Sequence, residues 1–247
     1  MSNRTLRFAI LKACRGLGPV TGLGLSPGKG RDALRWRIAM LEFYHSPGSC
    51  SNGILLLLHE LGASFDLHLV DVRKGEQRAP AYRQANPKGK VPALGLPGGG
   101  VLTEFPAIAV WLAAHHPDAG LWPADRMAQA RLVEALDFMI GSVHMRGFTF
   151  VKLPQKFLSD PEGQAALRAH GRDEVSRGLD LLSDQMGQGD YLLGEFSIAD
   201  TALFFLLCWA EEEGFAMPPN LAACLARLRA RPACRAAAPM LRRRVSA

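Results

Sequence analysis

Paired cysteines are missing from this 247-residue chain. Its five cysteines are odd in number and widely spaced, and none has a second cysteine three positions later. This spacing excludes a zinc knuckle and a dithiol redox motif, and we expect no metal site. Unpaired thiols are typical of a reducing compartment, so the expected location is the cytoplasm.

A long apolar run is also missing. The longest uncharged one, Thr201–Ala210, is far shorter than the roughly 20 residues that a membrane helix needs, so we expect no membrane partner. Hydrophobic residues make up 48% of the chain and charged residues 21%, which predicts a packed globular protein.

Most of the chain lacks an excess of basic charge. The net charge of +6 arises in residues 1–39, which hold eight basic side chains and one acid. The other 208 residues sum to −1, so we expect no nucleic-acid partner. Residues 1–39 are interpreted as a disordered extension or as sequence upstream of a true start at Met40. An Arg-rich, acid-poor segment could also resemble a transit peptide.

The hydrophobic pattern over residues 40–116 predicts an α/β unit with the order β-α-β-α-β-β-α. The expected elements are strand 41–45, helix 53–62, strand 65–72, helix 76–84, strands 91–96 and 101–103, and helix 106–115. The helix-breaking residues Pro117, Gly120 and Pro123 predict a linker over residues 117–125. Residues 126–247 predict an all-helical second domain, with helices over 126–148, 161–186, 197–213, 220–230 and 234–243.

Cys50 follows the first strand and the turn Ser46-Pro47-Gly48-Ser49, at the start of a helix. Helix N-termini carry unpaired N–H groups and positive partial charge, which stabilise a thiolate. This position favours a reactive thiol over the alternative of a small buried cysteine.

Three further motifs follow along the chain. In Asn86-Pro87-Lys88-Gly89-Lys90-Val91-Pro92-Ala93-Leu94, a proline before a strand can hold a cis bond and leave the Val91 backbone open to an extended ligand. Glu104 precedes a helix, either as a cap or as an acceptor for a ligand ammonium group. Ser197 and Asp200 have the spacing of a structural capping box.

In this order, the motifs make the chain resemble the glutathione transferases. The cysteine in SPGSCS makes it similar to the bacterial beta class in particular. The resemblance implies a thioredoxin-like domain that binds glutathione as co-substrate, followed by a helical domain that holds a small hydrophobic electrophile. It also implies a homodimer formed through the edge of the first domain and the helix 126–148.

The resemblance also implies roles for individual residues. The catalytic set is Cys50, the neighbouring Ser51, and His144. The segment Ser142-Val143-His144 matches the family segment that places a histidine over the active-site thiol. The glutathione-binding set is Lys90, Val91, cis-Pro92, Glu104 and the Phe105 N–H.

Some positions depart from the family pattern. The first strand ends in Tyr44-His45, Phe105-Pro106 follows the acid, Asp137 replaces an asparagine, and Met145 replaces a lysine. We expect these changes to weaken glutathione binding or alter which thiol is accepted, with compensation from Lys74, Lys88 and Lys90.

The implied activity is conjugation of glutathione to an electrophile. Cys50 could also form a mixed disulfide and support reductase or peroxidase activity, limited to a monothiol cycle because Gly53 stands where a resolving cysteine would be. A dehalogenase or isomerase using glutathione, and a non-catalytic binding or assembly module, are the alternatives. The electrophile pocket is expected along 139–150 and 211–215.

Overall fold

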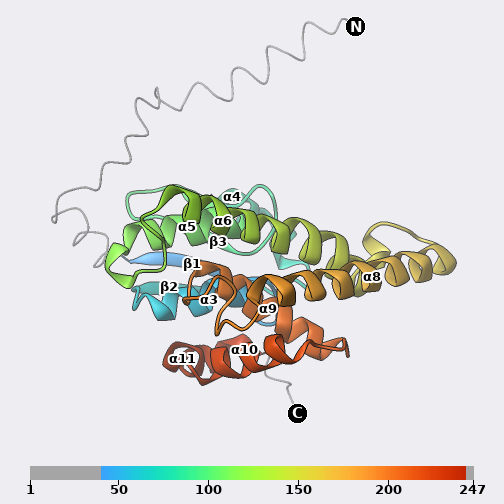
Figure 1. Cartoon of the computed structure of the whole chain (residues 1–247). Coiled ribbons are helices and arrows are strands. Elements are labelled where there is room, and N and C mark those ends of the chain that lie inside the picture. The colour runs from blue at the N-terminus through green and yellow to red at the C-terminus, as the bar shows by residue number, and fades with distance from the viewer. Residues whose placement is uncertain (1–39, 243–247) are drawn as a thin grey trace, which may run out of the picture.

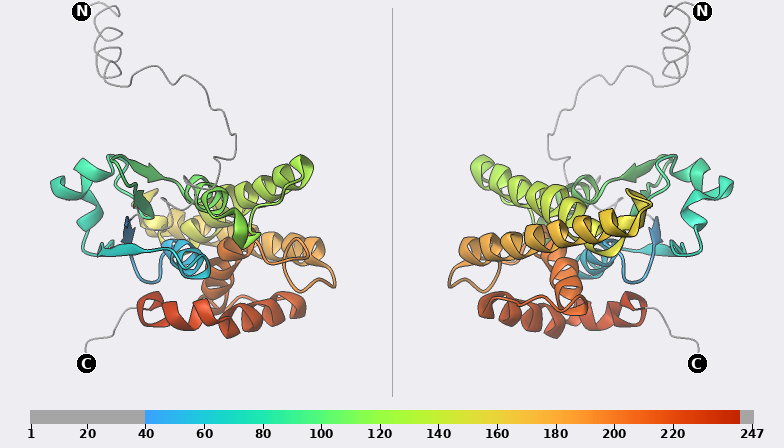
Figure 2. Two further views of the ribbon diagram at one scale, coloured as in Figure 1. Left: turned by 90° about the vertical axis from the view of Figure 1, so that its left-hand side faces the viewer. Right: turned by 90° about the vertical axis from the view of Figure 1, so that its right-hand side faces the viewer.

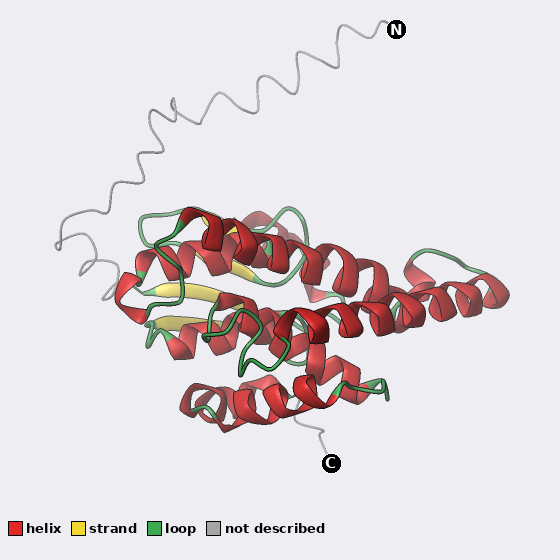
Figure 3. Cartoon of the chain, in the orientation of Figure 1, coloured by secondary structure: helices red, strands yellow, loops and turns green. Residues whose placement is uncertain are grey.

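The computed structural model describes residues 40–242, so the expectations for residues 1–39 lie outside the described residues. Figure 3 shows the strands of one small sheet lying among helices. Within the described range, no helix is both long and apolar enough to cross a membrane.

Four strands form the sheet in the order β2-β1-β3-β4. They are β1 (Leu41–His45), β2 (Phe65–Leu69), β3 (Ala93–Gly95) and β4 (Val101–Thr103). Strand β1 is parallel to β2 and antiparallel to β3, and β3 and β4 form the expected hairpin. Buried and exposed side chains alternate along β1, which places one of its faces in the core. The thioredoxin-like order of strands and helices is confirmed.

The helices of this first part are α3 (Ser51–Glu60), the 3-10 turn η1 (Glu76–Arg78), α4 (Pro80–Ala85) and α5 (Phe105–His115). The single helix expected over 76–84 is two short pieces, because Pro80 starts a new helix after the extended Ala79. The third strand starts at Ala93, not at residue 91, because Pro92 has no N–H to donate to a sheet.

The rest of the described chain is helical, as expected. After η2 (Pro117–Ala119) come α6 (Arg126–Asp137), η3 (Phe138–Phe148), α7 (Thr149–Lys152), η4 (Pro154–Lys156), α8 (Pro161–Met186), α9 (Ile198–Glu212), α10 (Pro219–Ala230) and α11 (Pro232–Leu241). Figures 1 and 2 show α10 and α11 together on the side of the molecule away from α6. The capping box of Ser197 and Asp200 at the start of α9 is confirmed.

The helix expected over 126–148 differs from the observed one. Its second half, η3, is a π-helix, in which i→i+5 hydrogen bonds widen each turn. This segment packs closely on α8, where a Cβ at Gly178 would lie 2.7 Å from a Val143 methyl carbon.

One hydrophobic core runs through both parts of the described chain. Its centre is α9, in which Leu203, Phe205 and Leu206 are completely buried. The buried residues of α3, such as Ile54 and Leu57, belong to the same core. The start of α3, where Cys50 lies, is therefore supported by the helical part.

Candidate functional site

A cleft of about 120 Å³ opens between the start of α3, the loop before β3, the start of α5 and the π-helix η3. It brings together seven of the eight predicted site residues: Cys50, Lys90, Val91, Pro92, Glu104, Phe105 and His144. Asn86, Thr103, Ile140 and Met145 complete the lining. Ser51 does not line the cleft.

Cys50 is half-buried, and its Sγ donates a hydrogen bond to the Val91 carbonyl at 3.5 Å. Burial raises the pKa of the thiol to about 12, and the N–H groups of Cys50 and Ser51 offset only part of this rise. The thiol is therefore neutral at pH 7 in the ligand-free protein. This direction is opposite to the one expected from the helix start, because desolvation opposes the effect of the helix terminus.

Ser51 is completely buried, and its hydroxyl points into the protein rather than into the cleft. Its Oγ lies 2.7 Å from His45 Nδ1, 2.7 Å from Ser49 Oγ and 3.1 Å from the Ser46 N–H. The Ser46 carbonyl oxygen lies 3.2 Å away as a further acceptor, so the donor and both acceptor sites of the hydroxyl have partners inside the protein. The structure thus differs from the expectation that Ser51 lies beside the reacting sulfur.

The Val91–Pro92 peptide bond is cis, as the motif predicted. Two side chains brace the preceding residue: Tyr82 Oη donates to the Lys90 carbonyl at 2.5 Å and Asn86 Nδ2 at 2.7 Å. Asn86 is almost fully buried and also lines the cleft, although no site role was predicted for it. The loop therefore reaches the cleft in one defined conformation.

Glu104 is the one non-glycine residue with positive φ in residues 40–242, at φ 72° and ψ 128°. Such a conformation costs on the order of 1–3 kcal/mol and is typical of functional sites. Glu104 makes no side-chain cap, and its Oε1 instead accepts from Lys88 Nζ at 2.8 Å. Both side chains are about half exposed, so this ion pair is weak and can exchange for a ligand ammonium group.

His144 projects from η3 into the cleft, where its ring meets the rings of Phe205 and Trp209 edge to face. Burial, together with smaller contributions from the charges of Lys90 and Lys156, lowers the pKa of His144 to about 4. The imidazole is therefore neutral at pH 7. Its Nδ1 is buried without a hydrogen-bond partner among the described residues, so its hydrogen-bonding capacity is unused in this state.

The π-helix determines which residues reach the cleft beside His144. Because i→i+5 bonds widen the turn, residues four and five apart share a face, and Ile140, His144 and Met145 all line the cleft. The expected pocket segment 211–215 does not line it. In that segment Phe215 packs on Phe148, and Glu213 pairs with Lys152.

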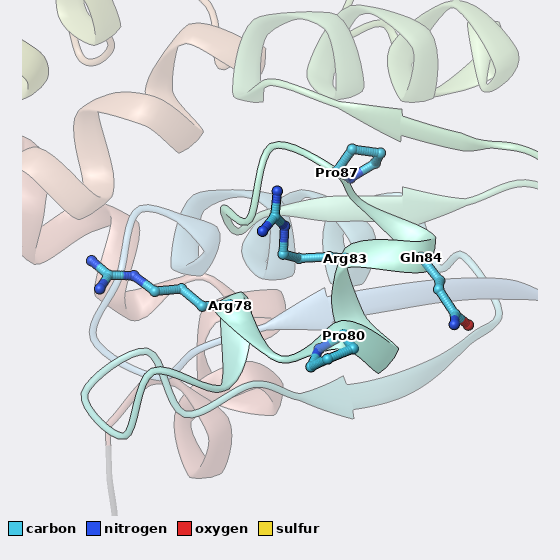
Figure 4. Close-up of a pocket in the computed structure, with 5 residues that line it drawn as sticks. All are labelled: Arg78, Pro80, Arg83, Gln84 and Pro87. Atoms are coloured by element: carbon cyan, nitrogen blue, oxygen red, sulfur yellow. The ribbon is translucent and has the colours of Figure 1, made fainter. Parts of the chain in front are cut away.

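A larger hollow, of about 400 Å³, lies outside this site, on the surface around α4. Figure 4 shows that the side chains of Arg78, Arg83 and Gln84 diverge there rather than converge on one point. None of its five lining residues is buried, so the arrangement holds no preformed polar site.

A family model described as the N-terminal domain of glutathione S-transferase matches residues 48–115. Glutathione S-transferase GstA of Escherichia coli O157:H7 is 32% identical over 173 residues, covering 69% of this chain and 82% of that protein. The matched segment contains every predicted site residue of the first domain.

Solved structures agree with these relatives. A bacterial beta-class glutathione S-transferase from Sphingomonas chungbukensis is 35% identical, with a TM-score of 0.70 over 81% of this chain and 99% of that one. A glutathione transferase homologue from Sulfitobacter, with bound glutathione, is 27% identical, with a TM-score of 0.77 over 82% of this chain and 98% of that one.

Proposed function

The chain belongs to the glutathione S-transferase family, and we propose that it conjugates glutathione to small hydrophobic electrophiles. The observation that carries this proposal is the composition of one cleft. A thiol at a helix start, a cis-proline loop, a strained acidic residue and an unpartnered histidine nitrogen all meet there.

Each part of the cleft fits a part of glutathione. The Val91 backbone precedes β3 and can pair with the cysteinyl unit of an extended peptide. Glu104 offers a carboxylate to the γ-glutamyl ammonium group, and the Phe105 N–H at the start of α5 offers a donor to the neighbouring carboxylate. Lys90 adds a positive charge at the rim of the cleft.

The neutral states of Cys50 and His144 suit them to stabilise a thiolate on glutathione. A neutral thiol and a neutral imidazole can each donate a hydrogen bond to the sulfur, and donors aimed at a developing charge lower its energy. The thiol proton leaves to solvent, the sulfur bonds to the electrophilic carbon, and the leaving group departs with its electron pair. Ile140 and Met145 give the electrophile an apolar wall.

The same observations weigh against the two rival readings. A protonated Cys50 is a poor nucleophile for forming a mixed disulfide, so the reductase or peroxidase route is secondary. A non-catalytic module would not need the strained backbone of Glu104 or the buried, unpartnered nitrogen of His144. Nothing in the cleft separates a dehalogenase or isomerase that uses glutathione from general conjugation.

We extend the proposal to the domain boundaries, the oligomeric state and the cellular location of the protein. The glutathione-binding domain is residues 40–116, the linker 117–125 and the helical domain 126–247. A homodimer is supported by Met127 and Val133, apolar side chains exposed on α6. A cytoplasmic location is supported by the free thiols of Cys50, Cys208, Cys224 and Cys234.

Steady-state kinetics with glutathione and chlorodinitrobenzene test the proposal. We expect Cys50→Ala and His144→Ala each to lower kcat/KM by about tenfold or more, since each removes a donor to the sulfur. The wild type is also assayed for disulfide reduction. A wild type without conjugation activity, or two variants with wild-type rates, would contradict the proposal.

A further inference from the structure

The turn that carries Cys50 is held by a helix that comes almost two hundred residues later in the chain. This Cys50 turn, residues 46–50, meets the last carbonyls of α11. The Leu241 carbonyl accepts from the Gly48 N–H at 3.0 Å and from Asn52 Nδ2 at 3.0 Å. The last carbonyls of a helix have no partner within the helix, so the Cys50 turn supplies their donors.

His45 links the same helix end to the inside of the turn. Its Nε2 lies 2.9 Å from the Met240 carbonyl oxygen, and its Nδ1 lies 2.7 Å from Ser51 Oγ. A carbonyl can only accept, so Nε2 carries the proton and Nδ1 accepts from the Ser51 hydroxyl. Both bonds of this completely buried ring therefore have a defined direction.

The Ser51 hydroxyl connects His45 to the Cys50 turn through further hydrogen bonds. The one proton of this hydroxyl has two acceptors within reach, His45 Nδ1 at 2.7 Å and the Ser46 carbonyl oxygen at 3.2 Å, and the shorter contact directs it to His45. The oxygen then accepts from the Ser46 N–H and from the Ser49 hydroxyl. Ser46 and Ser49 lie on either side of the Pro47-Gly48 bend that leads to Cys50. One buried imidazole thus connects the end of α11 to both sides of the bend.

We propose that His45 is a positioning residue: it connects the Met240 carbonyl to Ser51 and so fixes the Cys50 turn and the place of the Cys50 thiol in the cleft. His45 is not among the residues that line the cleft. The proposal rests on the proposed function, because the thiol that it positions is the one assigned to the glutathione sulfur.

Two substitutions at His45 separate the effect of its hydrogen bonds from the effect of its side-chain volume. Phenylalanine fills the space but makes neither hydrogen bond, whereas glutamine offers an NH₂ group to donate to the Met240 carbonyl and a carbonyl oxygen to accept from Ser51. We expect His45→Phe to lower kcat for glutathione conjugation by roughly tenfold or more. KM for glutathione should change little, because Val91 and Glu104 lie on other elements. His45→Gln should restore kcat to within about threefold of wild type.

His116→Phe is the matched control. His116 is also buried and also bonded to a helix carbonyl, that of Leu112, but it is not part of the Cys50 turn or the cleft. We expect it to lower the melting temperature and leave kcat unchanged. Asn52→Ala removes one of the two hydrogen bonds to the Leu241 carbonyl and the contact of Asn52 Oδ1 with the Gly48 N–H, without touching His45. It should lower kcat in the same direction as His45→Phe, even if that variant folds poorly.

A second readout does not depend on turnover. The rate at which iodoacetamide labels Cys50, followed by mass spectrometry of the Cys50 peptide, should rise about tenfold in His45→Phe and stay at the wild-type value in His45→Gln and His116→Phe. A wild type that turns over nothing contradicts the proposed function, while labelling still tests the role of His45. Unchanged kcat and labelling in His45→Phe, or a His45→Gln variant as impaired as His45→Phe, would overturn the proposal.

Discussion

Burial and the hydrogen bond to the Val91 carbonyl keep the Cys50 thiol protonated at neutral pH. As a protonated group, Cys50 can serve as a donor to the glutathione sulfur but not as the attacking nucleophile. The two roles need different chemistry from the side chain. A hydroxyl can replace the thiol as a donor, but it cannot form a disulfide.

We therefore expect Cys50→Ser to keep conjugation within about tenfold of wild type and to lose any disulfide reduction completely. Parallel assays of both activities, at saturating glutathione, make this measurement. Cys50→Ala serves as the control without a donor. Loss of conjugation in the serine variant to the level of the alanine variant would show that Cys50 acts through sulfur chemistry.

His45 gives the stability of the protein a defined dependence on pH. Burial lowers the pKa of His45 from 6.5 to about 4 in the folded protein, so the unfolded chain binds this proton first as the pH falls. The stability that the neutral ring contributes is complete above pH 6.5 and is lost as the pH falls towards 4. The loss amounts to about 3 kcal/mol.

Urea unfolding of wild type and His45→Gln at a series of pH values isolates this contribution, because His144 and the acidic groups are present in both proteins. We expect the difference in unfolding free energy to be constant above pH 6.5 and to shift against the wild type below it. A difference that does not vary with pH would mean that His45 has the same pKa in the folded and the unfolded chain, which would contradict the expected shift.

At the residue scale, the sequence predicted most of the cleft because its motifs are local. Cys50, Pro92 and Glu104 each stand beside a turn or helix start that can be read from neighbouring residues. Ser51 is the exception. The direction of its hydroxyl depends on His45 and on the Met240 carbonyl, and no local pattern indicates that these groups meet.

At the scale of elements, α3 and α9 cross so closely that Gly53 has no room for a side chain. A Cβ there would lie 2.3 Å from the Thr201 carbonyl oxygen and 2.8 Å from the Phe105 ring. The same contact leaves no room for a cysteine side chain at this position, so disulfide exchange at Cys50 would have no resolving thiol there.

Gly53→Ala should lower the free energy of unfolding by about 3 kcal/mol, because either the helices or Phe105 must move. Gly141→Ala is the control in another helix. The nearest atom to a Cβ there is 3.9 Å away, so the substitution should be neutral or stabilise by up to about 1 kcal/mol. Urea denaturation measures both, and equal effects would contradict the close crossing.

The π-helix η3 could not be predicted from the hydrophobic periodicity of the sequence. Apolar residues such as Leu132, Leu136 and Val143 fit ordinary helical spacing, so the pattern predicted one α-helix over 126–148. The switch to i→i+5 bonding arises within a segment packed on α8 and α9, which the sequence pattern does not describe. The cleft residues Ile140 and Met145 could not be assigned a common face without it.

At the scale of the whole molecule, an ion pair joins the end of α3 to the junction of α10 and α11. Arg231 makes two hydrogen bonds to the Glu60 carboxylate, one of them at 2.9 Å, and its guanidinium stacks 3.7 Å from the Phe196 ring. Glu60 is only 11% exposed, so loss of its partner would leave a buried charge.

Arg231→Met should therefore destabilise the protein by about 2 kcal/mol in urea unfolding. Arg131→Met removes an ion pair to Glu134 whose two side chains are both exposed by more than 60%, and it should change stability by less than about 0.5 kcal/mol. An Arg231 effect as small as that of Arg131 would contradict the role of this pair in joining the two parts.

Isothermal titration of the full chain with reduced glutathione tests the central claim most directly, because every assigned role depends on this ligand occupying the cleft. We expect wild-type protein to bind with a dissociation constant in the millimolar range or tighter. Glu104→Gln should weaken binding by about tenfold, since it removes a charged partner of the γ-glutamyl ammonium group. An analogue of glutathione without that amino group should bind both proteins equally. No binding by wild type at millimolar glutathione, or equal affinity of Glu104→Gln for glutathione, would contradict the account.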